Sequence, residues 1–304
     1  MRWTRSLAAP DGVGALLAQR CGLAVTGCAL VRSLTNDVYR VETAGGRAYA
    51  CKVYATGAGH VAWEQDLAAH LAAEGVTAAV PVPLSDGALV GTIDAPEGVR
   101  AFTVTVWATG DKPRPPWSDG LFHRYGVALA RLHLAADAFV SAHPARADDP
   151  MSTLDKALGE ASDAALPATG DPVVREMAAV ARERLRATPR PDIGVRHGDA
   201  SLDNLHLTHG GGVLWHDFDL AAVGWRVADL TGAYGGAHWP AFLEGYRTLR
   251  PVDTDAVVAL RVVELVRNIA WHLTAKVALR GSESIHEGWV ERELASLRDL
   301  RGRL

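Results

Sequence analysis

The fold is decided by the stretch Val195-Arg-His-Gly-Asp-Ala-Ser-Leu-Asp-Asn-Leu-His-Leu207 and by Val213-Leu-Trp-His-Asp-Phe-Asp219, which follows a glycine-rich turn. The short apolar runs on either side of this turn predict strands joined by tight loops. The loops carry three polar residues, Asp199, Asn204 and Asp217. One interpretation is that these residues only build turns, for which Asp and Asn are well suited.

A second interpretation is that the three polar residues perform phosphoryl transfer. That reaction requires positioned reactants, neutralised phosphate charge and a carboxylate beside the attacking hydroxyl. Asp199 is the candidate for the group that accepts the hydroxyl proton. Asn204 and Asp217 offer a neutral and a charged oxygen. Such a pair suits Mg2+, because this ion binds one or two protein oxygens together with phosphate oxygens and water.

The spacing of this stretch resembles two sequence motifs of kinases. His197-x-Asp199-x-x-x-x-Asn204 has the spacing of their catalytic loop, and Asp217-Phe218 stands where their magnesium-binding Asp-Phe stands. The segment is similar to the signature of a family of small-molecule kinases that includes aminoglycoside phosphotransferases, choline kinases and homoserine kinases. The resemblance covers nearly the whole chain. It indicates the fold and the reaction but not the phosphate acceptor.

Two N-terminal segments, Asn36-Asp-Val-Tyr-Arg-Val and Lys52-Val-Tyr, are closest to the branch of homoserine-kinase-like and bacterial stress-response kinases. The resemblance implies an α+β, bilobal, protein-kinase-like fold with the nucleotide between the lobes. A nucleotide-binding lobe with a five-stranded antiparallel sheet and a helix is expected over residues 1–109. A largely helical lobe for catalysis and acceptor binding is expected over residues 110–304. ATP and Mg2+ are the implied cofactors.

The resemblance also assigns roles to individual residues. Asp199 is expected to act as the base or to orient the hydroxyl, and Asn204 and Asp217 are expected to bind Mg2+. Asp219 is a candidate second carboxylate near the metal. If the strand continued through both residues, alternation would point its side chain away from that of Asp217. Asp229 resembles the residue that braces the catalytic loop in this family, and capping of a helix is the alternative role.

Composition places the chain among soluble globular proteins. It has 304 residues, of which 48% are hydrophobic and 22% charged. The formal net charge of -4 argues against a nucleic-acid partner. The three cysteines show neither metal-site spacing nor a disulfide framework, so a reduced, cytoplasmic setting is expected. We find no signal peptide and no uncharged run of membrane-spanning length, so no membrane association is expected.

The first part of the chain shows strand patterns and helix patterns in turn. Runs rich in β-branched and aromatic residues, bounded by turn residues, predict five strands. The spacing of Trp63, Leu67 and Leu71 predicts a helix. The predicted strands cover residues 29–34, 38–43, 48–54, 88–93 and 101–107, and the predicted helices cover residues 13–20 and 60–74.

Lys52 is the only one of four lysines that stands inside a strongly apolar strand. An unpaired ammonium would be costly there, so the lysine is expected to have an anionic partner. Glu64 is the favoured candidate, because it lies on or beside the apolar face of the next helix, whereas Glu74 stands at the helix end. The resemblance assigns such a lysine–glutamate pair to the nucleotide phosphates. The alternative is an edge-strand lysine that faces water.

Two further segments are nucleotide-binding candidates. Ser33-Leu-Thr-Asn-Asp37 stands where kinases have a glycine-rich loop, so Ser33 and Asn36 are candidate phosphate ligands, and a plain turn is the alternative. A P-loop is excluded, because no Gly-x-x-x-x-Gly-Lys-Ser/Thr occurs. Val106-Trp107-Ala108 resembles the kinase hinge, whose backbone contacts adenine.

The second half of the chain is predicted to be largely helical. Helices are expected at residues 118–139, 172–187, 253–279 and 284–300, with Asp171 as the cap of the second. His133 is expected to pack in the core. Glu264, Asn268, Trp271 and His272 recur on one stripe of the third helix. Because the C-terminal helices of related kinases wall the acceptor pocket, this stripe is a candidate acceptor site. Ordinary packing with a solvated edge is the alternative.

The predicted function is ATP-dependent transfer of the γ-phosphate to a hydroxyl of a small molecule, such as an amino acid, amino alcohol, sugar or aminoglycoside. Only Phe218 to Ala228 separate Asp217 from Asp229, which leaves no room for the long activation segment on which protein kinases seat a peptide. A small acceptor and activity without prior phosphorylation are therefore expected. Two alternatives stay open: a protein or peptide Ser/Thr kinase of the stress-response type, and a nucleotide-binding pseudokinase.

Overall fold

The computed structural model describes residues 5–55, 59–163, 172–189 and 191–303, which form two compact units. The first unit, here called the sheet unit, comprises Met1–Pro115, Leu134–Ala145 and Leu202–Leu220. The second, the helical unit, comprises Pro116–His133, Arg146–Ser201 and Ala221–Leu304. The predicted lobe boundary at residues 109 and 110 stays a prediction. In the described residues, no helix is both long enough and apolar enough to span a membrane.

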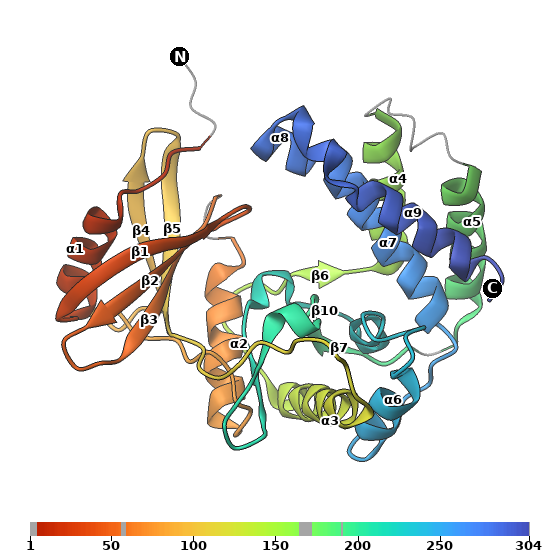
Figure 1. Ribbon diagram of the computed structural model, residues 1–304, viewed down its shortest axis with the longest axis horizontal. Helices are drawn as coiled ribbons and strands as arrows, with labels where there is room; N and C mark the ends of the chain where they lie inside the picture. The colour runs from red at the N-terminus through yellow and green to blue at the C-terminus, as the bar shows by residue number, and fades with distance from the viewer. Residues whose placement is uncertain (1–4, 56–58, 164–171, 190, 304) are drawn as a thin grey trace. The chain divides into compact units, whose positions relative to one another are not determined.

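The sheet unit contains the predicted five-stranded antiparallel sheet, with the strand order β1-β2-β3-β5-β4 (Figure 1). Its strands are β1 (Val25–Ser33), β2 (Asp37–Thr43), β3 (Ala48–Val53), β4 (Val90–Ala95) and β5 (Gly98–Val106). Its helices are α1 (Pro10–Cys21) and α2 (Val61–Ala73). These bounds agree with the predicted elements to within a few residues at most ends, which is the precision expected of sequence patterns.

Alternation along β3 separates a buried core from a cavity. Cys51 and Val53 are buried in a cluster with Val13 and Leu17 of α1. Lys52, between them, points to the opposite face, because successive side chains of a strand alternate. The core therefore holds the strand in the register that exposes Lys52 to the cavity described below.

A hairpin from a distant part of the sequence belongs to the sheet unit. Its strands are β8 (Leu205–Leu207) and β9 (Val213–Trp215). The backbone N–H of Trp215 donates to Thr77 O at 2.9 Å, and Trp215 O accepts from Ala79 N at 2.9 Å. The Trp215 side chain is fully buried. These contacts attach the hairpin, and the acidic loop after it, to the segment that follows α2.

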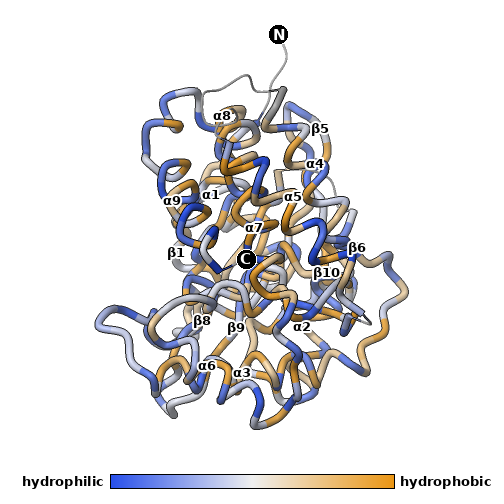
Figure 2. Tube along the Cα trace, turned by 90° about the vertical axis from the view of Figure 1, so that its right-hand side faces the viewer, coloured by the Kyte–Doolittle hydropathy of each residue, from blue (hydrophilic) through white to orange (hydrophobic). Residues whose placement is uncertain are grey.

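The helical unit is built around α7 (Val257–Leu273), which packs against α4, α5 and α9. Figure 2 shows α7 largely in hydrophobic colours, in agreement with its eleven buried residues. The other helices are α3 (Asp119–Ala135), α4 (Pro150–Asp163), α5 (Pro172–Ala187), α6 (Trp239–Arg247), α8 (Ala275–Arg280) and α9 (Trp289–Leu300). A three-stranded sheet has the order β6 (Ala147–Asp148), β10 (Ala222–Trp225), β7 (Ile193–Arg196).

The helical unit departs from the predicted elements at several points. The helix predicted over 253–279 is interrupted at Thr274, where φ is -122° and ψ is -81°, so it forms α7 and α8. The helix predicted over 118–139 ends at Ala135 and continues as a short 3-10 turn to Ala138. Helices α4 and α6 were not predicted, although each has a proline near its start, a known helix-start signal. Asp171, the predicted cap of α5, lies outside the described residues.

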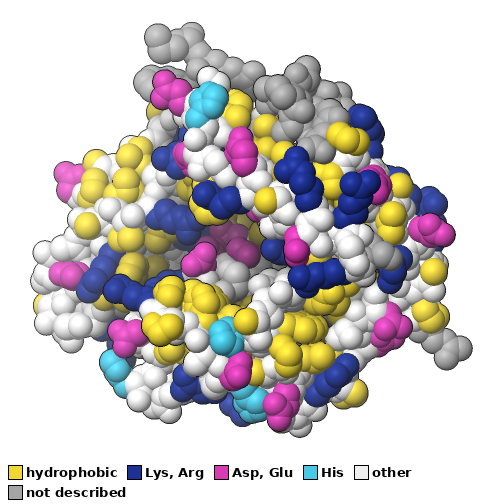
Figure 3. Space-filling model, turned by 45° about the vertical axis from the view of Figure 1, so that its right-hand side comes forward, with side chains coloured by type: hydrophobic (Ala, Val, Ile, Leu, Met, Phe, Trp, Pro, Cys, Tyr) yellow, Lys and Arg dark blue, Asp and Glu magenta, His cyan; other side chains and the backbone are white. Residues whose placement is uncertain are grey.

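Charged side chains of both signs are mixed on the face of the molecule shown in Figure 3. Blue and magenta side chains alternate there over short distances. This mixture agrees with 31 basic and 35 acidic residues in the whole chain.

Candidate active site

The sheet unit contains a cavity of about 420 Å³. Strands β2, β3 and β5, helix α2, the segment after β5 and the acidic loop after β9 contribute its walls. Its lining includes four of the six predicted nucleotide-binding residues, namely Lys52, Glu64, Trp107 and Ala108, and lacks Ser33 and Asn36. The predicted metal ligand Asp217 and the neighbouring Asp219 also line it. A cavity of this volume is in the range of small-molecule sites.

Two carboxylates hold Lys52 in this cavity. The Lys52 Nζ atom lies 2.6 Å from Asp217 Oδ1 and 2.6 Å from Asp219 Oδ1. Burial lowers the pKa of Lys52, but the charges of Asp219 and Asp217 outweigh it, so this pKa is raised above its ordinary value. Burial also raises the pKa of Asp219, against the opposing effect of Lys52. The lysine therefore stays charged.

The condition under which Asp219 would point away from Asp217 is not met, because the strand does not continue. Strand β9 ends at Trp215, and Asp217 is the one non-glycine residue in the described chain with a left-handed backbone, at φ 66°. A 3-10 turn, Phe218–Leu220, follows. This turn replaces strand alternation and brings both carboxylates to the same ammonium.

Asn36 holds the carboxylate of Asp219 in place. Its Nδ2 atom donates to Asp219 Oδ2 at 2.6 Å, and its Oδ1 atom accepts from Ala55 N at 3.1 Å. The Ser33 hydroxyl donates to Asp37 Oδ1 at 2.8 Å, at the turn between β1 and β2. The expected phosphate-binding roles of Ser33 and Asn36 stay predictions, and the observed bonds give both residues a part in shaping the loop.

Glu64 lies in α2 with 2% of its surface exposed and lines the same cavity as Lys52. The carboxylates that bond to Lys52 Nζ in the structure are those of Asp217 and Asp219, so the pairing with Glu64 stays a prediction. The sequence argument correctly required an anionic partner for Lys52. It missed the two partners found here because they lie about 165 positions away.

The hinge-like segment lies in the cavity wall, and its contact with adenine stays a prediction, since one of its backbone donors is already used. Trp107 N donates to Ala48 O at 3.0 Å, so a nucleotide contact at Trp107 would have to use its carbonyl group. Lys112 Nζ lies 2.9 Å from His216 Nε2 and also donates to the backbone oxygen of Asp203. Burial lowers the pKa of Lys112. Sequence analysis selected neither Lys112, which belongs to no motif, nor His216, which directly precedes the Asp217-Phe218 motif.

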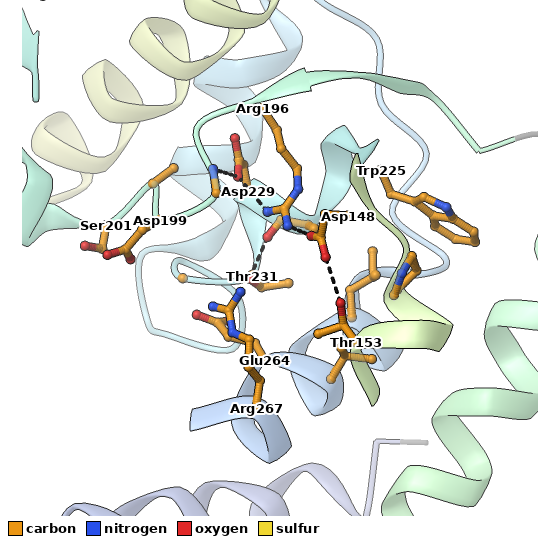
Figure 4. A pocket seen from close by; sticks show the side chains of 17 residues that line it. Asp148, Thr153, Arg196, Asp199, Ser201, Trp225, Asp229, Thr231, Glu264 and Arg267 are labelled. Carbon is orange, nitrogen blue, oxygen red and sulfur yellow. Dashed lines mark hydrogen bonds and ion pairs between the residues drawn. The ribbon is translucent and has the colours of Figure 1, made fainter. Parts of the chain in front are cut away.

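The helical unit contains a second, smaller cavity of about 50 Å³, shown in Figure 4. Asp199 lies in its wall, as an exposed residue of the otherwise buried loop after β7. The figure shows Glu264 and Arg267 on α7 and the guanidinium group of Arg196 between Asp148 and Asp229. The cavity therefore combines the predicted base with several fixed charges.

Asp229 holds the loop that carries Asp199. Its Oδ2 atom accepts from the backbone N–H of His197 at 2.6 Å, and its Oδ1 atom accepts from that of Gly198 at 2.9 Å. His133 Nε2 lies 3.1 Å from Oδ2. Burial raises the pKa of Asp229, but the His133 bond and the Arg196 charge outweigh it and lower this pKa well below its ordinary value. The predicted bracing role is confirmed.

Asn204 lies in a 3-10 turn of the sheet unit and is buried. Its backbone oxygen accepts from His216 N at 3.1 Å, which ties the turn to the residue before Asp217. The cooperation of Asn204 and Asp217 in metal binding stays a prediction.

The sequence matches the model of the phosphotransferase enzyme family over residues 27–253. The chain belongs to this family. The prediction of a kinase that acts as an O-phosphotransferase is thereby confirmed.

Relatives of this phosphotransferase include both sequences and solved structures. An uncharacterized protein of Deinococcus radiodurans is 31% identical over 94% of this chain and 88% of its own length. A homoserine kinase of Rhizobium etli is 27% identical over 67% of this chain and 65% of its own length. The structure of an amicoumacin kinase in complex with AMP-PNP and Ca2+ has a TM-score of 0.75 at 18% identity, with coverage of 96% and 94%. The predicted protein-kinase-like fold is confirmed by this similarity.

The predicted acceptor stripe of the phosphotransferase divides into two parts. Glu264 lines the second cavity. Asn268 donates to Glu293 at 3.3 Å, and the ring of His272 stacks on that of Trp289 at 5.8 Å, so these residues help to pack α7 on α9. Trp271 contacts the His272 ring.

Arg267, which sequence analysis did not select, lines the second cavity of this phosphotransferase. It stands three residues after Glu264 on α7, and residues at this spacing share a helix face. That spacing was the signal that could have found it. Burial raises the pKa of Glu264, but the charges of Arg261 and Arg267 outweigh it and lower this pKa.

Proposed function

We propose that the protein transfers the γ-phosphate of ATP to a hydroxyl group of a small molecule, with Mg2+ as the metal cofactor. The observation that carries the proposal is the pair of carboxylates, Asp217 and Asp219, that converge on the buried ammonium of Lys52 in the larger cavity. A charged lysine in a cavity of nucleotide size is suited to bind phosphate groups. The amicoumacin kinase, which has the same fold, is in complex with AMP-PNP and Ca2+, which supports the nucleotide and a divalent metal.

The acidic loop after β9 has oxygen ligands of the kind that magnesium prefers. The carboxylate oxygens of Asp217 and Asp219 are hard ligands held close together by their common partner, and Asn204 can add a neutral oxygen. Asp217 is the proposed charged ligand, because its side chain is partly exposed to the cavity. Bound Mg2+ would neutralise part of the phosphate charge.

The chain's own residues have distinct roles in this proposal. Lys52 binds a phosphate group, and Glu64, which lines the same cavity, helps to hold Lys52 in position. Trp107 and Ala108 form part of the wall against which the base of the nucleotide packs. Asp199 accepts the proton of the acceptor hydroxyl, and Asp229 orients the loop that carries Asp199.

A small acceptor is favoured over a peptide. The segment between Asp217 and Asp229 consists of a 3-10 turn, strand β10 and a second 3-10 turn, so it offers no long platform for an extended peptide. The cavity beside Asp199 is also small. The homoserine kinase relative supports an acceptor of amino-acid size.

The test is steady-state phosphorylation with MgATP and a panel of amino acids, amino alcohols, sugars, aminoglycosides and unfolded protein. We expect saturable transfer to a small hydroxyl compound and much slower transfer with Asp199→Asn. Efficient phosphorylation of peptides, with no small acceptor that does better, would favour the protein-kinase alternative. Nucleotide binding without transfer to any acceptor would favour the pseudokinase.

A further inference from the structure

The two guanidinium groups in the cavity beside Asp199 differ in whether a carboxylate of the wall pairs with them. Four carboxylates and two guanidinium groups line this cavity. Arg196 forms ion pairs with Asp148 and Asp229, so its charge is balanced within the wall. The remaining guanidinium is that of Arg267.

The Arg267 side chain forms no hydrogen bond or ion pair with any other described residue, although its charge contributes to the lowered pKa of Glu264. The neighbouring carboxylate of Glu264 accepts from Arg261 Nη1 at 2.8 Å, and Arg261 is not among the cavity-lining residues. Glu264 therefore has a partner behind the wall, whereas Arg267, which is half-buried, presents its charge to the cavity. A half-buried cation is stabilised when an anion binds to it, because part of its hydration has already been lost.

We propose that Arg267 binds a carboxylate of the phosphate acceptor, so that the preferred acceptor is a small hydroxy acid or hydroxy amino acid. This inference rests on the proposed function, since it concerns the acceptor in the cavity that contains Asp199. The planar guanidinium matches a carboxylate through two parallel hydrogen bonds, which gives both affinity and orientation. Arg267 is thus a specificity-determining residue.

The same charge disfavours acceptors that are only cationic. An amino alcohol or a polyamine-like compound brings no carboxylate to pair with Arg267, and this guanidinium repels its ammonium. Asp199 and Glu264 attract an ammonium, so the ammonium of a hydroxy amino acid can lie beside them while its carboxylate pairs with Arg267. We therefore expect acceptors with a carboxylate to be preferred over matched compounds that lack it.

Three probes of similar length separate these contributions. L-Homoserine has a hydroxyl, an ammonium and a carboxylate, 4-hydroxybutanoate lacks the ammonium, and 3-aminopropan-1-ol lacks the carboxylate. Their binding is measured by calorimetry on the full chain and on Arg267→Gln. Arg131→Gln is the matched control, because Arg131 is an exposed arginine of α3 outside the cavity lining.

We expect Arg267→Gln to weaken binding of 4-hydroxybutanoate and L-homoserine about 10- to 100-fold, as for loss of a charge-assisted hydrogen bond. Binding of 3-aminopropan-1-ol should not weaken, and Arg131→Gln should behave as the wild type. The inference is overturned if the wild type binds neither carboxylate probe at millimolar concentration. Equal weakening of all three probes would also overturn it. Unchanged melting temperatures establish that the variants fold.

Turnover separates this inference from the proposed function. With MgATP, Arg267→Gln should raise KM for L-homoserine with a smaller effect on kcat, and Arg267→Glu should reverse the preference in favour of 3-aminopropan-1-ol. If carboxylate binding depends on Arg267 but no probe is phosphorylated, the anion site stands and the proposed transfer to small molecules fails. Transfer that does not discriminate between the probes overturns the anion site alone.

A nucleotide phosphate is the other anion that Arg267 could bind, and a third measurement distinguishes it. The dissociation constant for AMP-PNP with Mg2+ should be the same for wild type and Arg267→Gln. If it weakens by the same factor as that for 4-hydroxybutanoate, Arg267 binds the nucleotide and the proposal is wrong.

Discussion

Lys52 and Asp219 are separated by 167 positions in the sequence, yet the lysine Nζ lies 2.6 Å from the carboxylate Oδ1. The bond joins strand β3 to the acidic loop after β9. It forms because the backbone turns at Asp217 and because Asn36 holds the second oxygen of Asp219. The contact therefore depends on three separate segments of the sheet unit.

The first prediction concerns this bond. Lys52→Met and Asp219→Ala should each weaken nucleotide binding, and together they should weaken it by less than the sum, because residues that share an interaction couple by about 0.5–3 kcal/mol. The measurement is a double-mutant cycle on the dissociation constant of AMP-PNP. A second cycle with Glu64→Ala tests whether Glu64 also couples to Lys52. Glu74→Ala, at the exposed helix end, is the control and should be additive.

The second prediction concerns the metal. Asp217→Ala should raise the Mg2+ concentration needed for half-maximal nucleotide binding, because it removes a charged ligand. Asn204→Ala should have a smaller effect, since it removes a neutral one. Titration of Mg2+ at a fixed concentration of fluorescent nucleotide measures both. An unchanged magnesium dependence of Asp217→Ala would contradict the assignment.

The third prediction concerns the base. Asp199→Asn should lower kcat by about a hundred- to ten-thousand-fold, the usual contribution of a general base. Nucleotide affinity and melting temperature should change little, because Asp199 is exposed and its loop is held by Asp229. Asp255→Asn, at an exposed position of the helical unit, is the matched control. Near-normal turnover of Asp199→Asn with the best acceptor would refute the role.

The fourth prediction concerns the pH dependence of stability. The folded-state pKa of Asp229 is depressed, so its ionised form stabilises the fold at pH values above its unfolded pKa of about 4. This contribution should be lost as the pH falls towards the lower folded pKa. Asp229→Ala should cost about 3–5 kcal/mol at pH 7, as for breaking a buried ion pair.

Urea unfolding of wild type and Asp229→Ala between pH 7 and pH 3 tests this sign. The difference in free energy of unfolding should be constant down to about pH 4 and should shrink below it. The exposed Asp94→Asn is the control. A difference that grows on acidification would mean that Asp229 is not the ionised brace described here.

Much of the sheet unit could be predicted because its signals are local. Alternation along β3 places Cys51 and Val53 in the core and Lys52 on the other face, and the structure agrees. The partner of Lys52 could not be predicted with the same ease. The contact with Asp219 depends on the left-handed backbone of Asp217. This conformation is rare for a residue with a side chain, and it produces no periodic pattern in the sequence.

The helical unit shows a different limit. The apolar period of α7 was strong enough to predict the helix, but not its interruption at Thr274. The stripe from Glu264 to His272 was correct as a helix face. Its residues nevertheless divide between the cavity and the contact with α9, because each neighbouring element covers only part of that face. Which part faces a ligand is decided by tertiary packing.

At position 217, the left-handed backbone favours glycine for stability, whereas the proposed metal binding requires the aspartate. A non-glycine residue in such a conformation costs on the order of 1–3 kcal/mol, which glycine would recover. Asp217→Gly would relieve this strain but would also remove the ion pair with Lys52 and the proposed metal ligand, so a gain in heat resistance requires that the strain outweigh the ion pair. A selection for heat-resistant variants therefore has to include a measurement of phosphate transfer, because stability alone does not report the proposed role of Asp217.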